Sequence, residues 1–134
     1  MAISLSDKRI LIVEDHEGVR KALRVILSPF YCVDIAETAC AALEIIIDRP
    51  IDLAIMDVDL PDYDGVELLR RVRVSRRDVK VIVISGRGSI ESAKEALLLG
   101  AMAYLLKPFN FAEILTLVEA GLKVENAESV SGQK

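Results

Sequence analysis

Polar side chains of the types that phosphate chemistry needs lie at the ends of apolar runs in this chain. They are the acidic pair Glu14 and Asp15, a third carboxylate at Asp57, the hydroxyl of Ser85 and the amine of Lys107. Carboxylates a few ångströms apart raise one another's pKa unless a cation lies between them, and Mg²⁺ prefers carboxylate oxygens and water as ligands. Three carboxylates, one lysine and one Mg²⁺ sum to zero charge, so we expect a neutral, oxygen-lined pocket.

A pocket of this composition can receive a phosphoryl group. Phosphoryl transfer is catalysed mainly by positioning and by charge stabilisation. We expect Mg²⁺ and Lys107 on the phosphoryl oxygens, Ser85 as a hydrogen-bond donor and one carboxylate as the nucleophile. Taken singly, these residues read as a loop acid, a turn serine and a solvated lysine, and only the set indicates chemistry.

Five short apolar runs, rich in β-branched residues, alternate with segments of helical period, which indicates repeated βα units and a parallel sheet. The runs are Arg9 to Val13, Tyr31 to Ala36, Leu53 to Met56, Val79 to Ile84 and Ala103 to Leu106. We predict a doubly wound, five-stranded α/β fold, (βα)5, with the flavodoxin-like strand order 2-1-3-4-5. In that order the first and third strands are neighbours, and their carboxyl ends meet at the switch point where such sheets hold ligands.

Helix boundaries are marked by capping residues and by glycine. The fourth helix is expected to begin after Ser89 as N-cap and to end at Gly100, and the fifth to begin at Asn110. After Leu122 the chain turns polar and loses its helical period. We therefore expect residues 1–122 to form the folded domain and residues 123–134 to be a frayed helix end followed by a polar tail or the start of a linker.

The composition limits the class of protein further. A chain of 134 residues with 52% hydrophobic and 28% charged residues is expected to fold as one domain, and its net charge of −4 disfavours nucleic-acid binding by phosphate neutralisation. The longest apolar stretch, Ala96 to Leu106, is shorter than a membrane span. Cys32 and Cys40 have apolar neighbours and are predicted to be buried thiols of a reducing compartment. We expect a soluble, cytoplasmic domain with no membrane partner and no direct nucleic-acid binding.

In their order along the chain, the polar residues resemble the receiver domains of two-component response regulators. The motifs are Glu14-Asp15, Met56-Asp57 followed by Leu60-Pro61 and Asp64-Gly65, Ser85-Gly86, and Tyr104 with Lys107-Pro108-Phe109. Each motif is weak alone, whereas the ordered set is highly specific. The resemblance covers about Lys8 to Leu122, nearly the whole chain.

The resemblance implies that Asp57 is the phosphoacceptor and that the reaction needs Mg²⁺. It also implies that Asp15 and Asp57 are direct Mg²⁺ ligands, that Glu14 acts through water, and that the backbone carbonyl of Asp59 completes the protein ligands. Such a domain accepts its phosphoryl group and loses it slowly, and it is not an enzyme of continuous turnover.

Further roles and partners follow from the same resemblance. Ser85 and Lys107 would hold the phosphoryl oxygens, and Tyr104 resembles the aromatic residue that rotates inward on activation, a population shift toward the state that phosphate favours. The donor would be a phosphohistidine of a sensor histidine kinase or a histidine phosphotransfer protein. Output would pass to an attached output domain, to a downstream protein or to a homodimer formed on activation. The segment Ser85 to Phe109 looks most like receivers of transcriptional activators.

The sequence departs from the common family pattern in modest ways. Ser85 stands where Thr is more usual, which keeps the hydroxyl but loses the branch that stiffens χ1, so looser coupling to Tyr104 is expected. Asp59 and Arg87 lie two residues after Asp57 and Ser85, and we predict an ion pair between them across the mouth of the site. Such a pair would modulate water access and hence the lifetime of the phosphoaspartate.

Two other functions share part of this pattern. A Mg²⁺-dependent phosphatase of the haloacid dehalogenase type also uses Asp, Ser or Thr, and Lys, and Asp57-Val58-Asp59 resembles its D-x-D motif. That family places D-x-D on its first strand and a further acidic pair after the lysine, so chain order favours the receiver. A receiver that binds partners without phosphorylation is disfavoured because no member of the set is missing.

Overall fold

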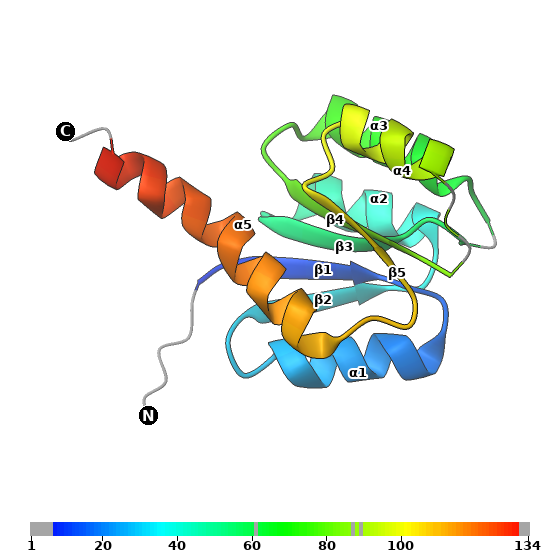
Figure 1. Cartoon of the computed structure of the whole chain (residues 1–134). Helices are drawn as coiled ribbons and strands as arrows, with labels where there is room; N and C mark the ends of the chain where they lie inside the picture. The colour runs from blue at the N-terminus through cyan, green and yellow to red at the C-terminus, as the bar shows by residue number, and fades with distance from the viewer. Residues whose placement is uncertain (1–6, 61, 87, 89, 132–134) are drawn as a thin grey trace.

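A computed structural model of the chain describes residues 7–60, 62–86, 88 and 90–131 (Figure 1). Its strands are β1 (Arg9–Val13), β2 (Cys32–Ala36), β3 (Leu53–Asp57), β4 (Lys80–Ser85) and β5 (Ala103–Leu106). Its helices are α1 (Glu17–Leu27), α2 (Ala39–Asp48), α3 (Gly65–Ser75), α4 (Ile90–Leu98) and α5 (Phe111–Ser131). The predicted alternation of strands and helices is confirmed.

The five strands form one parallel sheet in the order β2-β1-β3-β4-β5, which confirms the predicted topology. The register places Val13 of β1 beside Met56 of β3, and Asp57 of β3 beside Ile84 of β4. Because all strands run the same way, the residues that follow them share one edge of the sheet. The candidate site residues therefore start from one edge although they are far apart in sequence.

Alternate residues of each strand face opposite layers, so the sheet has two cores. One face packs against α1 and α5, and the other packs against α2, α3 and α4 (Figure 1). The α1 and α5 side is filled by fully buried side chains such as Ile12 and Ile55 with Leu23, and the opposite side by Leu11 and Met56 with Leu68 and others. Each helix is held by its apolar stripe, and the strand ends stay fixed relative to one another.

Polar side chains begin four of the helices by accepting backbone N–H groups that lack a helical partner. His16 Nδ1 accepts from Val19 N at 3.3 Å, and Asp64 Oδ1 accepts from Val66 N at 2.9 Å. Thr38 caps α2 in the same way, and Asn110 caps α5 as its sequence position predicted. The predicted N-cap of α4, Ser89, lies outside the described residues.

One prediction about this fold is wrong. Cys32 and Cys40 are exposed, not buried. Cys32 begins the edge strand β2, which is only partly covered, and Cys40 lies off the buried stripe of α2, which consists of Ala39, Ala42 and Ile46. Helix α5 extends to Ser131, and residues 123–131 contain neither glycine nor proline. The predicted boundary of the folded domain at residue 122 and the predicted tail over residues 123–134 stay predictions.

Within the described part of the chain, no helix combines the length and the apolar character needed to cross a membrane.

Candidate functional site

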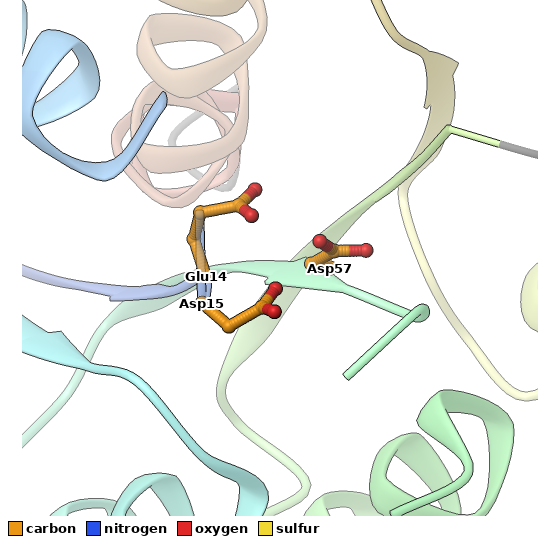
Figure 2. Close-up of side chains that lie close together, drawn as sticks. All are labelled: Glu14, Asp15 and Asp57. Atoms are coloured by element: carbon orange, nitrogen blue, oxygen red, sulfur yellow. The ribbon is translucent and has the colours of Figure 1, made fainter. Parts of the chain in front are cut away.

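Three carboxylates converge where β1 and β3 end. Glu14 and Asp15 follow β1, Asp57 ends β3, and one carboxylate oxygen of each lies within 4.8 Å of the others. Figure 2 shows the three side chains grouped at the ends of the two neighbouring strands. Glu14 and Asp57 are 0% and 1% exposed, whereas Asp15 is exposed. The cluster predicted from strand ends is therefore present, and one of its three members opens to solvent.

Lys107 supplies the positive charge of this cluster from the loop after β5. Its Nζ lies 2.9 Å from Asp57 Oδ2 and donates a hydrogen bond to it. The same Nζ donates to Glu14 Oε2 at 3.1 Å. One ammonium is thus shared by two buried carboxylates, and the lysine lies among the carboxylates as the sequence analysis expected.

The buried cluster carries more negative charge than the lysine offsets. The pKa of Glu14 is raised to about 7. Burial is the largest cause and the neighbouring Asp57 adds to it, while the His16 N–H and Lys107 act in the opposite direction. Burial also lowers the pKa of Lys107, but its hydrogen bonds to Asp57 and Glu14 outweigh that effect and the net shift is upward. Ionising Glu14 in the folded domain is therefore unfavourable without another cation.

The donor set suits a hard divalent cation. Glu14 Oε1 lies 3.0 Å from Lys107 Nζ, but it is buried and has no hydrogen-bond partner among the described residues. Buried carboxylate oxygens are normally satisfied by hydrogen bonds, ions or water. Three carboxylate groups that each place one oxygen within 4.8 Å of the others match the oxygen coordination that Mg²⁺ requires.

Asp59 lies beside this cluster, but its carboxylate is directed elsewhere. Its backbone N–H donates a hydrogen bond to Asp57 Oδ1 at 2.8 Å, which fixes the orientation of the Asp57 carboxylate. Its side-chain Oδ2 accepts from Ser85 Oγ at 3.2 Å and from Gly86 N at 3.0 Å. The predicted ion pair with Arg87 falls outside the described residues, because Arg87 is not among them. The predicted metal contact through the backbone carbonyl of Asp59 stays a prediction.

Ser85 and Tyr104 occupy neighbouring strands on this side of the sheet. Ser85 ends β4 and is 1% exposed. Tyr104 lies on β5 and is partly buried, and its hydroxyl has no hydrogen-bond partner within the part of the chain that is described. A Cβ added to Gly88 would lie 2.8 Å from that hydroxyl. Glycine at this position therefore allows the loop after β4 to lie directly against the tyrosine ring.

Arg20 belongs to the site although the sequence analysis did not select it. It lies on α1, is 9% exposed, and donates through Nη1 to the backbone oxygens of Glu14 at 3.2 Å and Asp15 at 3.3 Å. Its Nη2 lies 3.8 Å from a carboxylate oxygen of Glu37. A sequence signal did exist, because Arg20 shares the helical stripe of the buried Leu23. A charged residue on a buried stripe requires polar partners.

The loop after Asp57 is fixed by two contacts that the sequence did not predict. Asp62 accepts the backbone N–H groups of Ala39 at 3.1 Å and Cys40 at 3.3 Å, so it joins this loop to the start of α2. Gly65 packs against the backbone of Val58, and a Cβ added there would lie 2.6 Å from the Val58 oxygen. Close approach of the two backbones explains the glycine.

The sheet topology defines a doubly wound α/β domain, and an acidic cluster lies at its switch point. Comparison with known proteins then gives the family. The family model for the response regulator receiver domain matches residues 10–119, and the chain belongs to this family. This confirms the resemblance seen in the sequence and does not favour the phosphatase or the phosphorylation-independent receiver.

Individual relatives agree with the family assignment. The chain is 38% identical over 129 residues to response regulator MprA of Mycobacterium avium (strain 104), covering 92% of this chain and 56% of MprA. It is 33% identical over 123 residues to regulatory protein AtoC of Escherichia coli (strain K12), covering 88% of this chain and 26% of AtoC. The chain thus spans about a quarter to a half of the length of these relatives. The crystal structure of a CheY-like receiver domain protein from Methanospirillum hungatei JF-1 superposes with a TM-score of 0.87 at 36% identity, covering 92% of this chain and 99% of that one.

Proposed function

We propose that Asp57 of this receiver domain accepts a phosphoryl group from a phosphohistidine donor in a Mg²⁺-dependent reaction. The observation that carries the proposal is the carboxylate of Asp57 itself. It is 1% exposed, lies in the acidic cluster at the switch point and has a lysine 2.9 Å away. A carboxylate held in this way is a nucleophile whose charge and orientation are both controlled.

The contacts of Asp57 suggest how its two oxygens divide the work. Oδ1 accepts the N–H of Asp59 and Oδ2 accepts Lys107 Nζ, so the carboxylate plane is fixed. One oxygen forms the bond to phosphorus while the phosphorus–nitrogen bond of the phosphohistidine breaks, and the electron pair leaves with the imidazole nitrogen. Lys107 and Ser85 hold the oxygens of the transferred group. Hydrolysis of the adduct is slow, so the domain is not a turnover enzyme.

Mg²⁺ would be held by Asp15 and Asp57 directly, by Glu14 through water and by the backbone carbonyl of Asp59. When bound, the ion offsets the negative charge of the carboxylates and of the incoming phosphoryl group. Arg20 holds the backbone of Glu14 and Asp15 and so orients two of these groups. Support for the ion comes from the three carboxylate oxygens that lie within 4.8 Å of one another and from the pKa of Glu14, which is raised to about 7 mainly by burial.

The switch is proposed to act through Tyr104 and the surface around it. Its hydroxyl is buried without a partner among the described residues, so a second ring position costs no hydrogen bond. Large apolar side chains lie exposed nearby on α4 and β5, with Ile90 76%, Leu97 49% and Leu106 56% exposed. Such a patch fits an output domain, a downstream protein or a second copy on activation.

The wider setting is also a proposal. The donor is a sensor histidine kinase or a histidine phosphotransfer protein, the setting is the cytoplasm, and the output is control of transcription by a partner or an attached domain. Direct nucleic-acid binding by this domain is not expected, since its net charge is −4. We assign the receiver unit to residues 1–122 and a connecting role to residues 123–134.

Intact mass after incubation with acetyl phosphate tests the proposal. Wild type should gain one phosphoryl group only when Mg²⁺ is present, Asp57→Asn should gain none, and Asp48→Asn, at an exposed acid at the end of α2, should behave as wild type. No adduct on wild type would indicate a phosphorylation-independent binding module. Sustained hydrolysis of a general phosphate ester would indicate a phosphatase.

A further inference from the structure

The carboxylate of Asp59 is bound as an anion by the loop after β4. Two donors hold its Oδ2, the hydroxyl of Ser85 at 3.2 Å and the backbone N–H of Gly86 at 3.0 Å. Hydrogen bonds to an ionised acceptor are stronger than those between neutral groups. The contact joins the loops that follow β3 and β4, the two strands that carry Asp57 and Ser85.

The same pair of donors lies beside Asp57, at the end of the neighbouring strand. The register pairs Asp57 with Ile84, so Ser85 and Gly86 are the next two residues past the acceptor on the neighbouring strand. A Cβ added to Gly86 would lie 3.9 Å from Asp59 Oδ2 and 3.9 Å from Lys107 Cδ. The Asp59 carboxylate and the stem of the lysine that binds Asp57 therefore both lie close to Gly86.

We propose that the Asp59 carboxylate is a resident competitor of the phosphoryl group. It satisfies the Ser85 and Gly86 donors in the resting domain, and it has to leave them before these donors can bind phosphoryl oxygens. The inference rests on the proposed function of Asp57 and adds a residue that sets how readily phosphorylation occurs. Asp59 acts by occupying donors, so it is a positioning residue and not a catalytic one.

Charge and exposure make this exchange feasible. Asp59 is exposed, so its carboxylate can move into water without a desolvation cost. A phosphoryl group brings several anionic oxygens to the same donors and repels the Asp59 charge, so both cannot occupy them. The backbone N–H of Asp59 stays on Asp57 Oδ1 throughout, because it does not depend on where the side chain points.

Asp59→Asn tests the proposal, because it keeps the shape and the backbone contact while removing the charge. The rate of phosphorylation by acetyl phosphate with saturating Mg²⁺ should rise about tenfold, the scale of one charge-assisted hydrogen bond in a half-exposed setting. Affinity for beryllofluoride, a phosphoryl mimic, should rise by a similar factor. Glu91→Gln, which removes one exposed charge from the first turn of α4, is the matched control and should change either quantity less than twofold.

The backbone amide of Gly86 gives a readout that does not depend on phosphorylation. In metal-free wild type its NMR proton resonance should show a hydrogen bond to a carboxylate, and it should move upfield in Asp59→Asn. Beryllofluoride with Mg²⁺ should bring wild type and Asp59→Asn to the same Gly86 resonance, since the mimic then occupies both proteins.

Separate outcomes distinguish this inference from the function on which it rests. If wild type forms the Asp57 adduct but Asp59→Asn reacts at the same rate or more slowly, Asp59 is not a competitor and the receiver function stands. An unchanged Gly86 resonance in Asp59→Asn would overturn the inference as well. If neither protein forms an adduct or binds beryllofluoride, the proposed function fails first.

Discussion

Replacing Glu14 by glutamine should stabilise the metal-free domain at pH 8. Burial raises the pKa of Glu14 to about 7 from an ordinary value of 4.5. A group whose pKa is higher in the folded state contributes its full stabilisation of the fold at a pH below its unfolded-state pKa. This contribution is lost as the pH rises through the folded-state pKa. The difference between about 7 and 4.5 corresponds to about 3 kcal/mol of unfolding free energy, all of it lost by pH 8.

Glutamine removes this cost with little change of shape. Its oxygen can still accept the His16 N–H, which lies 3.0 Å from Glu14 Oε2 in the wild type. Lys107 keeps its 2.9 Å contact with Asp57, so the buried pair that remains is electrically neutral. We therefore expect Glu14→Gln to exceed the wild type by about 2–3 kcal/mol at pH 8 and to match it near pH 4.5.

Urea unfolding in EDTA from pH 4.5 to 8, followed by circular dichroism, measures this difference. Glu17→Gln is the control, because its partner Lys21 lowers the pKa of this exposed glutamate, so its small effect has the opposite sign. Adding Mg²⁺ at pH 8 should stabilise the wild type more than Glu14→Gln. A Glu14→Gln domain that is less stable than wild type at pH 8 in EDTA, or a difference that does not vary with pH, would refute the reasoning.

Three other substitutions test separate parts of the structure. Lys107→Met leaves two buried carboxylates without their cation, so it should lower the free energy of unfolding by urea by about 3 kcal/mol at pH 8 in EDTA. The loss should be smaller at pH 5, where Glu14 is protonated, and equal losses at both pH values would contradict this. Gly65→Ala places a Cβ against the backbone of Val58 and should lower the free energy of unfolding by about 3 kcal/mol. In Gly18→Ala the added Cβ meets only the imidazole ring of His16, so the loss by the same assay should be less than about 1 kcal/mol. Gly88→Ala should displace the ring of Tyr104, seen as greater quenching of tyrosine fluorescence by iodide; unchanged quenching would show that the loop moves instead.

The sheet order and the site edge could be predicted because both depend on patterns along the chain. Apolar runs separated by helical segments leave few topologies, and in a parallel sheet every residue that follows a strand lies on one edge. This is why Glu14, Asp57 and Lys107 could be grouped from sequence although Lys107 is 93 residues from Glu14.

Features that depend on side-chain direction in loops or on helix phase could not be predicted in the same way. The carboxylate of Asp59 turns toward Ser85 because of the loop conformation, which no periodic pattern encodes. Cys40 was assigned to the core from its apolar neighbours, but one step around a helix separates it from the buried Ala39. The position of Arg20 on the buried stripe of α1 was a usable signal, but its contacts with the backbone oxygens of Glu14 and Asp15 could not be predicted from the sequence.

The route of Lys107 into the site has a consequence for how the domain is made. Its contacts with Asp57 and Glu14 close loops of 50 and 93 residues, and β5 is an edge of the sheet and the last of the five described strands. During synthesis the first four strands can assemble before the lysine emerges, but the carboxylates are then without their counter-charge. Contacts of such long separation form late, because the entropy of closing the loop is lost first. Chains interrupted before β5 thus combine four of the five described strands with an acidic edge that lacks its lysine, and we expect them to be less stable than finished ones.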